Sequence, residues 1–171
     1  KKLTINIKLH TWNTMQVESK SYVNKSKTET LNLIRKQGNL NDFHPYCAHN
    51  TVTKWPGKGS VDHIEYLSGL KYRRDFIKWD DTGYTLEIGR NRKIAKVEWL
   101  VEGNNQESSL HITIKPKLPY KNGLIRYLAW NLYIKHKLQS YIDAVVRGFV
   151  EYTETGSRVD RNKYGKHAWF S

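Results

Sequence analysis

Three residues that could do chemistry lie close together in the sequence: His44, Cys47 and His49. Imidazole and thiolate groups bind zinc, and a thiolate beside an imidazole base can act as a nucleophile. The spacing is irregular for a zinc site, and no fourth ligand follows nearby. We therefore predict no metal site and no cofactor, and we interpret Cys47 as a buried, unreactive thiol.

The adjacent carboxylates Asp80 and Asp81 are a second candidate for acid and base chemistry. Such chemistry requires two carboxyl groups in a cleft that separates their pKa values. Here Thr82 and Gly83 follow directly, and an Asp-Asp-Thr-Gly sequence is typical of a tight turn. We predict that this pair stabilises a hairpin, and we assign no catalytic residue in the chain.

Length and cysteine content limit the class of protein. A chain of 171 residues is predicted to form one main domain with its own core. The single cysteine, Cys47, cannot form an internal disulfide, which fits a reducing, cytoplasmic location. In the C-terminal helical region the longest uncharged run covers residues 127–134, which is too short to span a membrane.

Of the net charge of +13, +6 lies within residues 108–150. Residues 108–150 contain seven Lys or Arg residues and a single acid, Asp143. Lys and Arg attract phosphate, but the sequence shows none of the usual nucleic-acid recognition motifs. We predict no specific nucleic-acid partner. A solvated helix face and an anionic membrane surface both remain as interpretations of this charge.

The elements that must position any site are read from hydrophobic periodicity. Ser26 and Glu29 have the spacing of a capping box and predict a short helix over residues 27–36, followed by a second helical turn within residues 39–46. Turn sequences rich in Gly, Asn and Asp separate the predicted strands, so we expect an antiparallel meander. The strands are predicted at residues 15–23, 50–55, 61–67, 70–79, 84–89, 94–101 and 108–115.

Residues 121–153 predict one long helical region with a single apolar stripe. A straight helix of this length would measure roughly 50 Å, so we expect a bend near residues 135–137. The second part of the helix is predicted to pack on the sheet. The first part contains Tyr127, Trp130 and Tyr133, which could form a membrane-interface belt, pack on the sheet edge or lie within a dimer.

The order of strand, two short helices, six-stranded meander and long helix resembles the START/Bet v 1-like superfamily, also called SRPBCC or polyketide cyclase/dehydrase, over residues 15–155. The resemblance rests on the following segments: Phe43-His44-Pro45, Gly59-Ser60-Val61, Ser68-Gly69-Leu70, Trp79-Asp80-Asp81, Val97-Glu98-Trp99 and Arg147-Gly148-Phe149. It implies an α+β helix-grip fold, in which a curved seven-stranded antiparallel sheet wraps a long C-terminal helix around a cavity. Members bind lipids, sterols, plant hormones or polyketides, and some are enzymes.

The resemblance also implies which residues face the cavity. Ser68, Gly69 and Leu70 are similar to the gate loop of abscisic-acid receptors, although Lys71 replaces the proline that follows there. Asp62 is expected at the cavity mouth, and Arg74 is expected to pair with Asp62 or a ligand carboxylate unless it faces outward. The predicted cavity residues are Asp62, Ile64, Tyr66, Arg74, Phe76, Tyr84, Val97, Trp99, Ile142, Val145 and Phe149.

These patterns together predict a peripheral leader over residues 1–14, the helix-grip domain over residues 15–156 and a tail over residues 157–171. The tail looks like that of a bacterial branch of the superfamily and is expected to dock on the domain or on a partner chain. The predicted function is binding or transport of a hydrophobic or amphipathic small molecule, lipid-like or polyketide-like. One alternative is a polyketide cyclase or dehydratase in which Arg74 and Tyr66 polarise a carbonyl. The other is a membrane-surface or partner-binding protein that uses the basic helix.

Overall fold

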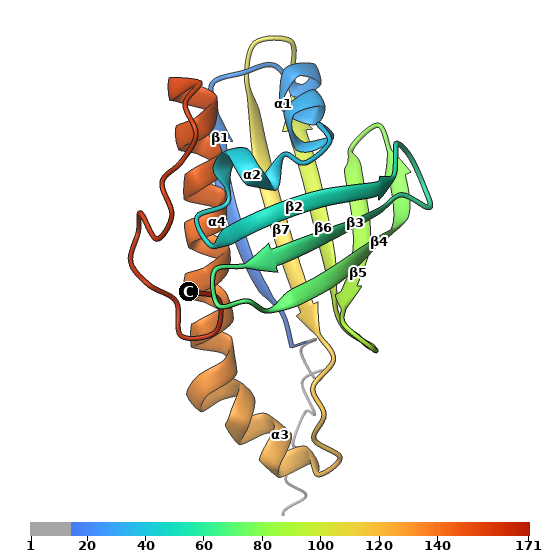
Figure 1. Cartoon of the computed structure of the whole chain (residues 1–171), viewed down its shortest axis with the longest axis vertical. Coiled ribbons are helices and arrows are strands. Elements are labelled where there is room, and N and C mark those ends of the chain that lie inside the picture. The colour runs from blue at the N-terminus through green and yellow to red at the C-terminus, as the bar shows by residue number, and fades with distance from the viewer. Residues whose placement is uncertain (1–14) are drawn as a thin grey trace, which may run out of the picture.

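The computed structural model of the chain describes residues 15–171. The predicted leader, residues 1–14, lies outside this range. Seven antiparallel strands form one curved sheet in the order β1-β7-β6-β5-β4-β3-β2, and a long helix runs along it (Figure 1). The strands are β1 (Val17–Val23), β2 (Cys47–Lys54), β3 (Val61–Tyr66), β4 (Lys71–Asp80), β5 (Gly83–Gly89), β6 (Lys93–Gly103) and β7 (Ser108–Pro116).

Residues 15–171 also contain five helical elements: α1 (Lys27–Ile34), α2 (Leu40–Phe43), α3 (Gly123–Ala129), the π-helical segment η1 (Trp130–Ile134) and α4 (Lys135–Thr155). The predicted capping box begins α1, where the Glu29 amide donates to the Ser26 hydroxyl and the Ser26 amide donates to the Glu29 carboxylate. The prediction of a helix-grip fold is confirmed.

Short connections of at most six residues join the consecutive strands from β2 to β7, as the sequence predicts. The β4–β5 turn depends on Gly83, whose φ of 152° lies in a region that other residues rarely adopt. A Cβ at this position would lie 1.9 Å from the carbonyl oxygen of Trp99 on β6. Glycine therefore allows β5 to approach β6 directly after the turn.

The first strand boundary of the meander differs from its prediction. β2 begins at Cys47 rather than at residue 50, because an irregularity in its pairing with β3 between Cys47 and His49 interrupts the alternation of side chains. This bulge leaves Cys47 buried and His49 exposed. Alternation alone could not recognise the beginning of this strand.

The C-terminal helical region bends, but slightly earlier than predicted. Its π-helical segment, Trp130–Ile134, separates α3 from α4, and α3 projects beyond the end of the sheet (Figure 1). π-helical insertions are a known cause of helix kinks. The expected position, residues 135–137, lies in the first turn of α4.

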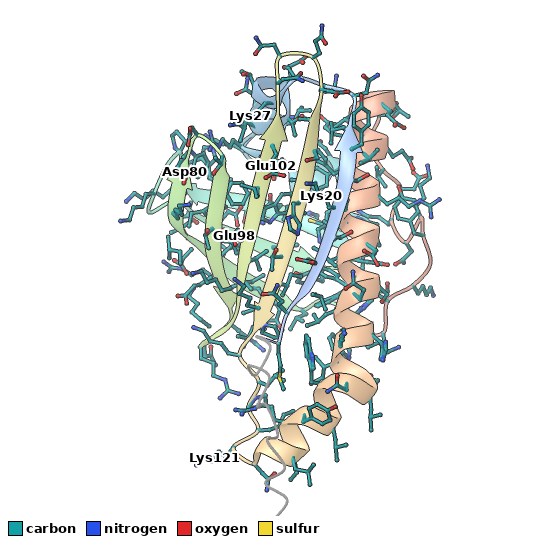
Figure 2. The ribbon with its side chains drawn as sticks, turned by 180° about the vertical axis from the view of Figure 1, so that it is seen from behind. Lys20, Lys27, Asp80, Glu98, Glu102 and Lys121 are labelled. Atoms are coloured by element: carbon teal, nitrogen blue, oxygen red, sulfur yellow. The ribbon has the colours of Figure 1, made fainter. Side chains whose placement is uncertain are left out.

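The core lies between the inner face of the sheet and one stripe of α4. Ile142, Val145 and Phe149 of that stripe are each at most 2% exposed. The opposite face of the sheet carries charged residues, including Lys20, Glu98 and Glu102 (Figure 2). The Lys20 ammonium lies 2.8 Å from the Glu102 carboxylate there. Within the described residues, no helix is sufficiently long and apolar to cross a membrane.

Candidate ligand cavity

A largely apolar cavity of about 90 Å³ lies between the inner face of the sheet and α4. It is closer to the end of the molecule where β6 begins and α4 begins, because Ile94 and Leu138 both line it. The other lining residues are Leu40, His44, Ile64, Tyr66, Tyr72, Arg74, Leu86, Ile88, Ala95, Val97, Trp99, Ile112, Ile114, Tyr141, Ile142, Val145 and Phe170.

The structure divides the predicted cavity residues into two groups. Those that line the cavity are Ile64, Tyr66, Arg74, Val97, Trp99, Ile142 and Val145. Those that are buried but do not line it are Asp62, Phe76, Tyr84 and Phe149.

Aromatic packing explains why three members of the second group do not reach the cavity. Phe149 contacts Phe43 edge to face, with ring centroids 5.1 Å apart. Phe76 and Tyr84 pack in the same way at 5.0 Å, and Tyr84 also stacks on Trp99 at 5.6 Å. These rings fill the interior beside the cavity, so facing the inside of the sheet is not sufficient to line it.

Arg74 and Asp62 form a buried ion pair. They lie directly opposite each other on β4 and β3, and their side chains are 5% and 1% exposed. The Arg74 Nε donates to Asp62 Oδ1 at 2.6 Å, and Nη2 donates to Oδ2. Burial lowers the pKa of Arg74, but attraction to and hydrogen bonds with the Asp62 carboxylate outweigh this, and the pKa rises overall. Asp62 was expected at the cavity mouth, but its side chain is 1% exposed and does not line the cavity.

A chain of hydrogen bonds runs from α2 to the cavity. His44 Nε2 lies 3.0 Å from the Tyr141 hydroxyl, which lies 3.1 Å from the Tyr66 hydroxyl. Burial, with the nearby positive charges of Arg74 and Arg161, lowers the pKa of His44 to about 3, so its imidazole is neutral at pH 7. Burial also raises the pKa of Tyr141 to about 12 and raises that of Tyr66, so both tyrosines carry their protons.

The C-terminal tail, residues 157–171, folds back along α4 and supplies Phe170 to the cavity wall (Figure 1). The Phe170 ring packs on Tyr66 and Tyr141, with centroids 4.4 and 4.6 Å away. The His167 ring stacks on Phe170, and its Nε2 donates to the carbonyl oxygen of Lys137 on α4. The tail thus closes one side of the cavity against its tyrosines.

The β3–β4 loop, which resembles a gate, contacts this tail and not the cavity. The Ser68 amide donates to the Phe170 carbonyl at 3.3 Å, and the Ser68 hydroxyl donates to the Trp169 carbonyl at 3.0 Å. Ser68 and Gly69 are exposed, Leu70 is partly buried, and none of the three lines the cavity.

His44, Cys47 and His49, the candidates for metal and thiol chemistry, have different surroundings. Burial raises the pKa of Cys47 to about 11, so the thiol keeps its proton at neutral pH. His44 uses both ring nitrogens in hydrogen bonds, whereas His49 is exposed. In residues 15–171 there is no group of three or more His, Cys, Asp or Glu side chains that could hold a metal ion.

The Asp80–Asp81 pair belongs to the β4–β5 turn. One Asp80 oxygen accepts hydrogen bonds from the Thr82 amide at 3.0 Å and from the Thr82 hydroxyl at 2.6 Å. Asp81 is exposed. These contacts describe an Asx turn at the end of a hairpin.

Three residues that line the cavity were not predicted from the sequence to do so: His44, Tyr141 and Phe170. His44 was considered as a zinc ligand and as a base for Cys47, but not as a residue of the cavity wall. Tyr141 lies 97 residues from His44 in the sequence, so no local pattern connects the two. The apolar composition of the tail end was a signal for burial of Phe170, but not for its place in the cavity wall.

Comparison with solved structures identifies the fold. Neither the family models nor the curated proteins contain a match to this chain. XoxI from Bacillus cereus is 15% identical, with a TM-score of 0.62 over 82% of this chain and 96% of that one. The di-domain ARO/CYC BexL is 11% identical, with a TM-score of 0.58 over 82% of this chain and 47% of BexL. Ara h 8.0201 is 14% identical, with a TM-score of 0.53 over 80% of this chain and 97% of that one. The chain therefore has the helix-grip fold of Bet v 1-like proteins.

Proposed function

We propose that this protein binds one small hydrophobic molecule in the cavity between the sheet and α4. The observation that supports this most directly is the cavity itself, whose walls are mainly aliphatic and aromatic side chains from both layers. Cavities of this composition, with a few placed polar groups, are typical of small-molecule sites. Here the residues with polar groups that line the cavity are His44, Tyr66, Tyr72, Arg74 and Tyr141.

The size of the cavity limits the ligand. Its volume of about 90 Å³ is below the roughly 300–1,000 Å³ typical of sites for drug-sized molecules. A compact molecule with one ring fits this space better than a long-chain lipid or a polyketide. A larger ligand would require Phe170 and the tail to leave the cavity wall.

Cyclase chemistry is less well supported than binding. The ARO/CYC name belongs to BexL, and an identity of 11% transfers the fold and not the reaction. In the cyclase alternative, Arg74 would polarise a carbonyl group of the substrate. Its guanidinium already makes two hydrogen bonds to Asp62, whose negative charge compensates it. We therefore propose binding as the function of the site.

Titration of the full chain with acetophenone, monitored by ¹H–¹⁵N NMR, tests this proposal. Acetophenone combines a single aromatic ring with one carbonyl group. We expect saturable shifts at amides around the cavity, and their loss in Ala95→Phe, because a phenyl ring at this lining position fills the space. Tyr22→Phe, on an exposed residue, is the control and should bind normally. The absence of saturable shifts in the unaltered chain would contradict the proposal.

We propose a second function, docking on anionic membranes, for the surface formed by α3 and η1. This surface exposes a group of large apolar side chains: Leu124, Ile125, Tyr127, Leu128, Leu132 and Tyr133. Leu124 and Leu132 are 67% and 74% exposed, and α3 has no buried residue. Exposed apolar groups at this density mark an interaction site.

The charge of the surrounding segment favours an anionic membrane as the partner. Residues 108–142 contain no Asp or Glu. Their basic residues are Lys115, Lys117, Lys121, Arg126, Lys135 and Lys137. An apolar face bordered by Lys and Arg is typical of helices that lie in the interface of anionic bilayers. A second copy of the same surface would bring like charges together.

Sedimentation with phosphatidylcholine vesicles, with and without phosphatidylglycerol, tests this second function. The full chain should bind the anionic vesicles only, and less as salt increases. Leu124→Asp combined with Leu132→Asp should abolish binding, whereas Ile77→Asp, at an exposed apolar position on β4, should not. No vesicle binding, or a dimer that the two Leu→Asp substitutions dissociate, would overturn it.

A further inference from the structure

The tautomer of His44 follows from its hydrogen bonds. The Tyr46 amide donates to His44 Nδ1 at 3.2 Å, so Nδ1 is an acceptor and carries no hydrogen. The imidazole is neutral, because burial lowers its pKa to about 3. Its one hydrogen is therefore on Nε2, which faces the Tyr141 hydroxyl at 3.0 Å.

Counting hydrogens along this chain leaves one unused. His44 Nε2, the Tyr141 hydroxyl and the Tyr66 hydroxyl each carry one hydrogen, which makes three. The chain contains only two contacts, one between His44 and Tyr141 and one between Tyr141 and Tyr66. Each contact uses one hydrogen. Whichever way the hydroxyl groups rotate, one O–H of the tyrosine pair has no partner within the chain.

The described residues supply no acceptor for this hydrogen. Neither tyrosine hydroxyl has a further hydrogen bond within residues 15–171. Tyr66 and Tyr141 both line the cavity, and Phe170 covers their rings from the tail side. The cavity is thus the place from which an acceptor can come.

The charges around the cavity indicate a neutral acceptor. Arg74, which lines the cavity, is already paired through two hydrogen bonds with Asp62. A carboxylate ligand would be buried without a cation of its own, which is costly. A carbonyl oxygen accepts an O–H hydrogen without adding charge.

We propose that the Tyr66–Tyr141 hydroxyl pair donates one hydrogen bond into the cavity and selects neutral ligands that carry an acceptor oxygen, such as ketones. This inference rests on the proposed binding function and adds the chemical class of the ligand. His44 acts as a positioning residue, because its Nε2 hydrogen is donated to the Tyr141 hydroxyl and so orients the pair.

Comparison of acetophenone with α-methylstyrene tests the inference. The two molecules have nearly the same shape, but a C=CH₂ group replaces the carbonyl, so only acetophenone can accept the hydrogen bond. NMR titration of the full chain should give a dissociation constant about fivefold lower for acetophenone, the effect of one neutral hydrogen bond. Tyr66→Phe combined with Tyr141→Phe should remove this preference. Tyr22→Phe, which removes an exposed hydroxyl that does not line the cavity, should keep it.

The possible outcomes test the chemical class of the ligand and the binding function separately. Equal affinity for the two molecules in the unaltered chain would overturn the inference and leave the binding function intact. Binding of neither molecule would overturn both. The ¹⁵N chemical shifts of His44 give an independent check that needs no variant, since hydrogen on Nδ1 instead of Nε2 would invalidate the count.

Discussion

Arg74 places a full positive charge in the core. Pairing with Asp62 offsets the free-energy cost of removing this charge from water. Two charges leave water to form this pair, so its net contribution to stability is small even though each partner depends strongly on the other. The pair also restricts the chemistry of the cavity. Because the positive charge is compensated within the protein, no anionic ligand is needed for charge balance.

Removal of one partner should destabilise the protein far more than removal of both. Asp62→Ala leaves an uncompensated buried guanidinium, and we expect the free energy of unfolding to fall by about 3–5 kcal/mol. The double variant Asp62→Leu with Arg74→Met should recover most of this loss. Urea unfolding monitored by circular dichroism measures both. A double variant as unstable as the single one would show that the pair has a different role.

His44 should make the protein sensitive to mild acid. In the folded protein burial lowers its pKa from 6.5 to about 3, whereas in the unfolded chain the pKa stays near 6.5. Between these values the unfolded state binds the proton and the folded state does not, so stability decreases as the pH falls below 6.5. The loss from this residue should reach about 2 kcal/mol by about pH 5.

Urea unfolding at about pH 7 and pH 5 measures this loss. His44→Gln, which keeps a donor toward Tyr141, should show a smaller decrease than the unaltered chain. Burial also lowers the pKa of His167, so a decrease from that residue should remain in the variant. An unchanged decrease in His44→Gln would contradict the assignment.

At the residue scale, interactions within hairpins could be predicted from the sequence, whereas interactions between distant segments could not. That Arg74 requires a partner, and that Asp62 is a candidate, follows from charge burial and strand pairing. The His44–Tyr141–Tyr66 chain joins α2, α4 and β3, and no local pattern indicates that these residues meet. Only the packing of the whole fold brings them together.

At the scale of elements, α4 is held to α2 by a close backbone contact. Gly148 lies in the interior of α4, where glycine normally lowers helix stability. A Cβ at this position would lie 2.2 Å from the carbonyl oxygen of Phe43. The missing side chain therefore allows α4 to approach the end of α2, where His44 and the hydrogen-bond chain begin.

Gly148→Ala should destabilise the protein despite the higher helix propensity of alanine. The added methyl group meets backbone, which cannot move aside without shifting α2, and we expect a loss of about 1–3 kcal/mol. The matched control is Gly123→Ala in α3, where a Cβ would meet nothing within 4 Å, and it should be neutral or slightly stabilising. Thermal unfolding of both variants measures the difference. Equal effects would show that the α2–α4 contact is not tight.

The existence of the elements was predictable, and their irregularities were not. Alternation and turn residues predicted the meander, because hairpin chemistry is local. The bend occurs in Trp130–Ile134, a segment without Pro or Gly, so no local breaker marks it. The bulge at the beginning of β2 likewise depends on its pairing with β3.

At the scale of the whole molecule, the cavity and the basic apolar surface occupy the same end. The cavity is lined by Ile94 and Leu138, near the beginnings of β6 and α4, and α3 projects from that end of the sheet (Figure 1). The proposed membrane surface and the proposed ligand site are therefore neighbours. The helix-grip fold could be predicted from the sequence. With it came an interior between the sheet and α4 in which a cavity can form. The cavity volume could not be predicted, because it depends on how the aromatic rings and Phe170 fill the interior.

Intermolecular nuclear Overhauser effects from acetophenone test the central claim most directly, because they locate the bound molecule. The experiment observes contacts between its aromatic protons and side-chain methyl groups of the full chain. We predict contacts with Val97, Ile112 and Val145, which line the cavity from β6, β7 and α4. Contacts confined to exposed residues such as Leu124 and Leu132 of the α3–η1 surface would contradict a ligand site between the sheet and α4.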